Sequence, residues 1–316
     1  MGFRDQSCKL LAIALLVSGG VASGALAAMQ ARGGAMEERE LGPSGTARPD
    51  AHIAYGNDPL QAVDLYLPPR RVGERAGNAA PPPIAVFVHG GGWARGNLSM
   101  VAQKPEYFAR AGWAFASIGY RLVPNATVEQ EAADVGMALQ RLRAEAAARG
   151  YDGNRILLFG HSAGAHLVSL VGTDPQYAGD AFGAIRGVIP IDGAAYDVPR
   201  QLASAGQFML QRTYIPAFGS DVARQRALSP TNHVGAPDAP DWLFLYDAQR
   251  ADAVDQAELL GGSLRRDGAR VATLAMHYPE RQVLARHRRI NVDFGTPDYA
   301  ANDQVAAMMA RVAAGD

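Results

Sequence analysis

The sequence predicts an α/β protein in which a mostly parallel sheet is covered by helices on both faces. Short continuous apolar runs, such as residues 84–88 and 155–159, have the length and composition of strands that are buried on both sides. Longer stretches with helical character lie between these runs, so strands and helices alternate along the chain. The composition agrees, because 316 residues with 48% hydrophobic and 19% charged residues suffice for one large α/β domain.

The expected elements follow in order along the chain. Two strands over 52–56 and 62–68 are joined by a turn at Asn57-Asp58-Pro59, and a polar, proline-rich loop covers 70–83. The remaining strands are expected at 84–88, 113–120, 155–159, 185–191, 242–246 and 271–276. The helices are expected at 101–111, 128–149, 165–171, 254–266 and 303–312. Residues 193–234 interrupt the alternation with short helical pieces, and we expect them to form a small cap-like insertion beside a pocket.

The first 50 residues are not expected to belong to the fold. Residues 1–27 have a basic start, an apolar core at 10–17 and the small-x-small sequence Ala25-Leu26-Ala27. These features predict a signal peptide and export to a bacterial periplasm or medium. The apolar core is short for a membrane span, and an uncleaved membrane anchor is the alternative. Residues 28–50 predict a flexible leader, and one α/β domain is expected over 51–316.

The charge and the cysteine content exclude several classes of function. The formal net charge is −1 and the arginines are scattered, so no basic field is available for nucleic acid or an acidic membrane surface. The one cysteine, Cys8, lies inside the expected signal peptide, so thiol catalysis, disulfides and cysteine-ligated metals are excluded for the exported chain. The sequence has no phosphate loop or dinucleotide-binding glycine motif. We therefore expect no cofactor, no metal, no nucleic-acid partner and no stable membrane association after signal cleavage.

The pentapeptide Gly160-His161-Ser162-Ala163-Gly164 stands between an expected strand and an expected helix. A sharp strand–turn–helix junction strains its central serine and exposes the hydroxyl above the sheet, as a nucleophile requires. Upstream, His89-Gly90-Gly91-Gly92-Trp93 follows another strand, where bare backbone N–H groups can form an oxyanion hole. The two motifs in this order predict a serine hydrolase with Ser162 as nucleophile. The expected oxyanion donors are the N–H groups of Gly91, Gly92 and Ala163.

With these motifs the chain resembles the α/β-hydrolase family, and within it exported carboxylesterases of the hormone-sensitive-lipase-like and feruloyl-esterase-like (BD-FAE-type) groups. The resemblance runs from residue 54 to the C-terminus and includes Gly119-Tyr120-Arg121-Leu122-Val123-Pro124 and Leu228-Ser229-Pro230. It implies an α/β-hydrolase fold, a triad in the order serine, acid, histidine, no cofactor, and hydrolysis of small-molecule esters with small or aromatic acyl groups. Arylformamidases share the motifs and are one alternative. A hydrolase fold that has lost its acid and serves as a binding protein is the other.

The triad order requires a histidine after the last strand, which leaves His277 and His287. His277 stands at the end of the strand itself, where a packed or edge position is the simpler interpretation. His287 lies in the following segment, expected as a loop, which resembles the catalytic-histidine segment of the family. Family members usually have a small residue where this chain has Arg288. We expect His287 to be the general base.

The acid is expected in the loop after the strand at 242–246, where a carboxylate can orient the imidazole. The commonest family spacing places the carboxylate near Gln249, which cannot carry a negative charge. Asp252 matches a second acidic position of the similar enzymes and is the expected acid, although an aspartate before a helix can also be an N-cap. Asp247 and Asp255 remain as alternatives.

Further side chains are expected to support the site. His89 is expected to hold the glycine run by bonding to backbone, and Arg121 and Asp134 to form an ion pair that braces it. Trp93 either walls the substrate pocket or packs in the core. Asp192, at the end of a strand, either lines the acyl pocket or makes structural hydrogen bonds. The sequence leaves open which ester is the substrate and what the oligomeric state is.

Overall fold

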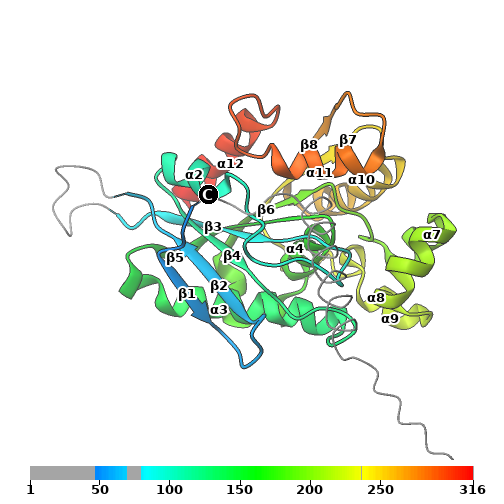
Figure 1. Ribbon diagram of the computed structural model, residues 1–316, viewed down its shortest axis with the longest axis horizontal. Coiled ribbons are helices and arrows are strands. Elements are labelled where there is room, and N and C mark those ends of the chain that lie inside the picture. Colours follow the sequence, from blue (N-terminus) through cyan, green and yellow to red (C-terminus); the bar gives the residue numbers. More distant parts are fainter. Residues whose placement is uncertain (1–46, 70–79, 236, 316) are drawn as a thin grey trace, which may run out of the picture. The chain divides into compact units, whose positions relative to one another are not determined.

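The computed structural model describes residues 47–69, 80–235 and 237–315 (Figure 1). The expected signal peptide over 1–27 and most of the expected leader over 28–50 lie outside the described residues. The first strand begins at Ala51, where the sequence places the start of the domain. Within the described ranges, no helix has the length and apolar character that crossing a membrane requires.

An eight-stranded sheet with the order β1-β2-β4-β3-β5-β6-β7-β8 forms the centre of the domain (Figure 1). β1 (Ala51–Ala54) and β2 (Ala62–Tyr66) pair antiparallel, as do β2 and β4 (Ala114–Ile118), whereas the remaining pairs are parallel. The other strands are β3 (Pro83–Val88), β5 (Asp152–His161), β6 (Ile185–Ile191), β7 (Asp241–Asp247) and β8 (Arg270–Met276). The strands from β2 to β7 are buried at almost every position, as expected when helices cover both faces.

Two layers of helices enclose the sheet. Alternate residues of β3 enter two separate apolar clusters, with Val86 in one and Phe87 in the other, because successive side chains of a strand point to opposite faces. The cluster around Val86 includes residues of α3 (Val128–Arg149), α4 (Ala163–Thr173) and α10 (Ala251–Arg266). The cluster around Phe87 includes residues of α2 (Lys104–Arg110), α11 (Val283–Val292) and α12 (Asn302–Ala314).

The predicted α/β class and its mostly parallel sheet are confirmed. The main difference concerns the segment that carries His287. That segment was expected to be a loop, but it forms the helix α11. Its residues include leucine, alanine and arginine, which favour helix, and contain no glycine or proline that would interrupt it.

Residues 193–234, expected as an insertion, form a group of short helices that we call the cap. Its helices are α6 (Val198–Ser204), α7 (Gln207–Met209), a π-helical turn (Leu210–Tyr214), α8 (Ile215–Phe218) and α9 (Val222–Ala227). In Figure 1, α7, α8 and α9 lie together at one side of the domain. Arg224 of α9 pairs with Glu129 of α3 at 2.7 Å, which ties the cap to the helical layer. Shorter helical turns are α5 (Pro175–Ala178) and the 3-10 segments Gly179–Ala184 and Pro230–Asn232.

Candidate active site

Ser162 stands at the junction of β5 and α4, with φ 56° and ψ −118°. A positive φ is strained for a residue with a side chain, so the surrounding structure must hold it in place. The turn is tight enough to require glycine on both sides. A Cβ at Gly160 would lie 2.4 Å from the carbonyl oxygen of Gly164, and one at Gly164 would lie 2.1 Å from that of Val88. Ser162 is therefore presented, partly exposed, by a turn with the geometry of a nucleophile elbow.

The glycine run that follows β3 lies directly against this turn. A Cβ at Gly90 would lie 3.0 Å from the Cβ of Ser162. Gly91 and Gly92 have φ values of 134° and 61°, a backbone that glycine adopts without steric cost. Among the hydrogen bonds of the described residues, none uses the N–H of Gly91 or Gly92. Ala163 is the first residue of α4, where N–H groups lack an intrahelical partner, so all three expected oxyanion donors lie on the segments beside Ser162.

His89 holds the glycine run as expected. Its Nδ1 atom lies 2.8 Å from the carbonyl oxygen of Gly90. Tyr120 stacks on the His89 ring at 4.3 Å between centroids and donates its hydroxyl to the His89 carbonyl at 2.8 Å. Burial lowers the pKa of His89 to about 4, so the ring is neutral near pH 7. His89 is therefore a structural residue of the loop.

The ion pair expected between Arg121 and Asp134 is present, at 2.7 Å, and the Asp134 side chain is completely buried. The same carboxylate accepts the backbone N–H of Arg121 at 3.0 Å. Two residues further on, the N–H of Val123 donates to the carbonyl oxygen of Trp93 at 2.9 Å. The pair thus anchors the segment that holds the end of the glycine run.

Trp93 packs in the core beneath the cap. It is 4% exposed, and its indole N–H lies 3.3 Å from Nδ1 of His166, whose Nε2 atom is 2.8 Å from a cap carbonyl. Its ring meets Phe218 of α8 edge-on at 4.7 Å between centroids. The cap also reaches the oxyanion loop, because a Cβ at Gly92 would lie 3.1 Å from Cγ2 of Thr213. A substrate bound at the oxyanion loop would therefore have Thr213 as a neighbour.

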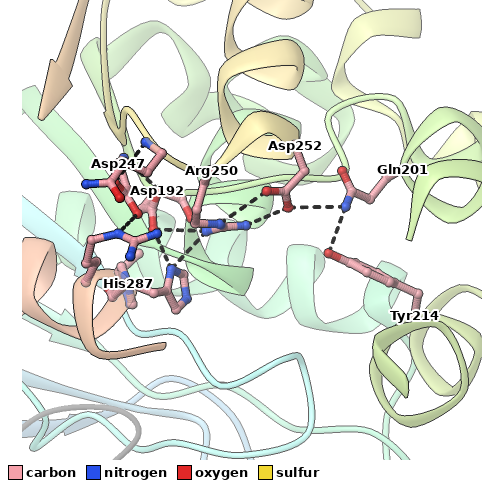
Figure 2. Close-up of polar contacts among 10 residues, drawn as sticks. Asp192, Gln201, Tyr214, Asp247, Arg250, Asp252 and His287 are labelled. Atoms are coloured by element: carbon pink, nitrogen blue, oxygen red, sulfur yellow. Dashed lines mark hydrogen bonds and ion pairs between the residues drawn. The ribbon is translucent and has the colours of Figure 1, made fainter. Parts of the chain in front are cut away.

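The structure brings His287 to Asp192. The Nδ1 atom of His287 lies 2.6 Å from Oδ2 of Asp192 (Figure 2). Asp192 is the first residue after β6, and the N–H of Ser162 donates to the carbonyl of Ile191 at 3.0 Å, so Ser162 and Asp192 leave neighbouring strands at the same level. On its other side, His287 is held by His161, whose Nε2 atom lies 2.8 Å from the His287 carbonyl oxygen.

The surroundings of Asp192 keep its carboxyl group ionised. Burial alone would raise the pKa of Asp192, but the charge of Arg250 and the hydrogen bonds from His287 and the Asp247 N–H hold it well below its usual range. The Asp247 N–H lies 3.0 Å from Oδ1, and Nη1 of Arg250 lies 2.9 Å from Oδ2. A negative group thus faces Nδ1 of His287, which favours a proton on Nδ1 and leaves Nε2 free to accept one.

Asp252, the expected acid, does not make this contact. Its carboxylate pairs with Arg250 at 2.7 Å and lies 3.4 Å from Nε2 of Gln201 (Figure 2). Asp252 is not the N-cap of α10 either, since Arg250 occupies that position. The loop after β7 therefore places the guanidinium of Arg250 beside His287, where the sequence predicts a carboxylate.

The alternative candidates for the acid and the base do not contact the His287–Asp192 pair in this way. Asp247 is buried and forms an ion pair with Arg286 at 2.7 Å. Asp255 pairs with Arg200 of the cap at the surface, at 2.5 Å. His277 follows β8 and is exposed.

The sequence indicates Asp192 only as a pocket residue or a maker of structural hydrogen bonds, and it gives no role to Arg250. A signal for Asp192 was available, because it directly follows the strand beside the nucleophile strand. The carboxyl ends of parallel strands meet at one edge of a sheet, so the end of β6 can supply an acid as readily as the end of β7. The strained φ of 46° at Asp192, which resembles that of Ser162, is visible only in the structure.

Comparison with known proteins agrees with this architecture. Residues 63–183 match the family model BD-FAE. Esterase LipC of Mycobacterium tuberculosis is 35% identical over 129 residues, which cover 40% of this chain and 30% of LipC. The probable isoprenylcysteine alpha-carbonyl methylesterase ICMEL2 of Arabidopsis thaliana is 33% identical over 117 residues, which cover 37% of this chain and 26% of ICMEL2. The chain thus spans less than a third of the length of these curated relatives.

The crystal structure of esterase B from Lactobacillus rhamnosis has a similar fold. It superposes with a TM-score of 0.69 at 21% identity and covers 93% of this chain and 95% of that chain. The family-model match includes both glycine motifs, and the fold likeness extends over nearly the whole chain. The chain therefore has the α/β-hydrolase fold, and its residues 63–183 are similar to the BD-FAE family.

Proposed function

We propose that the protein is a serine hydrolase that cleaves carboxylic esters of small or aromatic acyl groups through an acyl-enzyme intermediate. The observation that carries the proposal is the strained Ser162, which lies against a glycine run and bonds through its N–H to Ile191, the residue before the Asp192 that contacts His287. Two relatives named as esterases support the reaction class. Esterase B of similar fold is inhibited by a tributyrin phosphonate, a reagent that resembles an ester.

In the proposed acylation step, the Ser162 hydroxyl attacks the ester carbonyl carbon while Nε2 of His287 takes the hydroxyl proton. The charge that develops on the carbonyl oxygen is stabilised by N–H groups of the glycine run and of Ala163. Asp192 is the acid of the triad in this proposal, because its negative charge stabilises the imidazolium that forms. The alcohol leaves when His287 returns the proton to its oxygen.

In the deacylation step, His287 takes a proton from a water molecule, and the resulting hydroxide attacks the acyl carbon of the Ser162 ester. The C–O bond to Ser162 then breaks, Ser162 regains its proton from His287, and the carboxylic acid is released. These steps use only groups of the chain and water.

We also propose that the protein is exported and that residues 1–27 are removed. The proposal rests on the basic start, apolar core and small-x-small sequence of this segment. The N-terminal sequence of protein recovered from the periplasm or medium should begin near Ala28. Protein that stays in the cytoplasm with its first residues intact would contradict it.

The function is tested with p-nitrophenyl acetate, butyrate and octanoate, methyl ferulate and an N-formyl arylamine. We expect the esters to be hydrolysed and Ser162→Ala to lose that activity. Faster turnover of the formamide than of every ester would instead favour the formamidase alternative. Equal background rates for both proteins would contradict the proposal and favour a binding protein.

A further inference from the structure

Arg250 contacts both members of the His287–Asp192 pair. Its Nη1 atom lies 2.9 Å from Nδ1 of His287 and 2.9 Å from Oδ2 of Asp192 (Figure 2). The same nitrogen lies 2.9 Å from the Asp192 carbonyl oxygen. The Arg250 side chain is only 11% exposed, so water and salt screen its charge weakly at this distance.

The contacts continue from Arg250 into the cap. Nη2 of Arg250 pairs with Asp252 at 2.7 Å, and Asp252 lies 3.4 Å from Nε2 of Gln201 in α6. Gln201 in turn donates to the hydroxyl of Tyr214 at 3.0 Å, and both side chains are buried. Figure 2 shows these groups in a line that leads away from His287. Tyr214 is next to Thr213, the cap residue beside the oxyanion loop. This series of contacts therefore links Arg250, beside His287, to the part of the cap that lies near the glycine run.

The chemistry of a guanidinium decides what this contact does. Arginine carries a permanent positive charge and only donors, so it cannot accept a proton from His287. With a proton on Nδ1, His287 and Arg250 both donate to Oδ2 of Asp192. Protonation of Nε2 then places a second cation beside the first, and the repulsion disfavours the imidazolium. The fixed charge of Arg250 thus favours the neutral imidazole, which is the form that accepts a proton from Ser162.

We propose that Arg250 is a positioning residue that holds Asp192 toward His287, disfavours the imidazolium form of His287 through its fixed charge, and couples both to the cap. The inference rests on the proposed function, because it concerns the same His287. It adds a residue that the triad scheme does not contain.

The remaining charged groups around His287 do not replace Arg250. His161 is neutral, because burial and the nearby His287 hold its pKa well below the usual range. Asp247 and Arg286 compensate each other in a buried pair. Asp192 acts opposite to Arg250, since an anion favours the imidazolium. Further titratable or charged groups on the surrounding elements include Lys104 of α2, Asp252 of α10, Arg288 and Arg289 of α11 and Tyr278 after β8.

The test is the pH profile of kcat/KM for p-nitrophenyl acetate in the full protein and in Arg250→Gln. The acid limb of this profile reports the protonation of the free enzyme's base. Removal of the cation takes away the repulsion that disfavours the imidazolium, so we expect the limb to move up by about one pH unit. Arg200→Gln is the matched control, because Arg200 is an exposed cap arginine paired with Asp255, and it should keep the wild-type profile.

An acid limb that is unchanged or moves down in Arg250→Gln would overturn the inference, even if the rate falls. If Arg250→Gln does not fold, Asp252→Asn carries the test. Loss of that anion leaves the Arg250 charge less compensated, so the limb should move down, and an unchanged or raised limb would overturn the inference. Ser162→Ala separates the two claims. If Ser162→Ala retains full activity, the proposed function fails, whereas an unshifted Arg250→Gln profile overturns only the role of Arg250.

Discussion

His287 and Asp192 lie 95 positions apart in the sequence, and their side chains meet with 2.6 Å between Nδ1 and Oδ2. The sheet makes this contact possible. Asp192 follows β6, which is paired with the strand that ends at Ser162, and α11 carries His287 back over the same edge. Asp192, which contacts His287, thus follows the strand next to the one that ends at Ser162.

The choice of Asp192 over Asp252 is tested by substituting each with asparagine. Asp192→Asn removes the charge that stabilises the imidazolium, and we expect kcat to fall about 10³- to 10⁴-fold. Asp252→Asn should stay within about tenfold of wild type near pH 8, since Asp252 reaches His287 only through Arg250. Circular dichroism should show both variants folded. A large loss in Asp252→Asn with little loss in Asp192→Asn would return the acid to the loop after β7.

The tight packing of the elbow is expected to limit substitution at Gly164. Alanine there would place Cβ 2.1 Å from the carbonyl oxygen of Val88, so the strand and helix must move apart. Overpacking of this kind costs about 1–3 kcal/mol, and the midpoint of thermal unfolding should fall by several degrees. Gly183→Ala is the control, because its Cβ would meet nothing within 4 Å. Equal melting temperatures for the two variants would show that the elbow is less tightly packed than the structure indicates.

Two buried histidines are expected to make the protein less stable in mild acid. Burial lowers the pKa values of His89 and His166 to about 4, whereas an unfolded histidine titrates near about 6.5. Between these values the unfolded chain binds more protons, so the free energy of unfolding falls as the pH falls. Each histidine should contribute about 2 kcal/mol of this loss between pH 7 and pH 5.

Urea unfolding of wild type and His166→Gln at pH 7 and pH 5 measures this contribution. The variant should lose less stability between the two pH values than wild type does, whatever its stability at pH 7. His277→Gln, which alters an exposed histidine, should show the wild-type difference. A His166→Gln difference equal to that of wild type would show that His166 is not held neutral by the fold.

Much of the fold could be predicted from local patterns. Continuous apolar runs such as 84–88 and the capped helix over 128–149 have boundaries that the sequence itself signals, and the structure has β3 and α3 there. Ser162 could also be predicted, because a strained turn between a strand and a helix requires flanking glycines, and these are visible in the sequence. The pairing of Arg121 with Asp134 followed from the expectation that a strand end and the next helix lie together.

The electrostatic arrangement at His287 could not be predicted in the same way. Which carboxylate meets the imidazole depends on the register of β6 against β5 and on the position of α11, and both are set by tertiary packing. The sequence favours Asp252 as the acid, with Asp247 and Asp255 as alternatives, and it indicates Asp192 only as a pocket or structural residue. Their roles separate only when the partners of Arg250 and Arg286 are known, because each arginine engages a particular aspartate.

The most direct measurement is labelling of the protein with a p-nitrophenyl phosphonate ester, followed by mass spectrometry of the intact chain and of its peptides. The account predicts one phosphonyl group per chain, located on Ser162, with loss of ester hydrolysis in proportion to labelling. Ser162→Ala should take up none. Full hydrolysis of p-nitrophenyl acetate by a chain whose Ser162 is labelled or replaced would contradict the account.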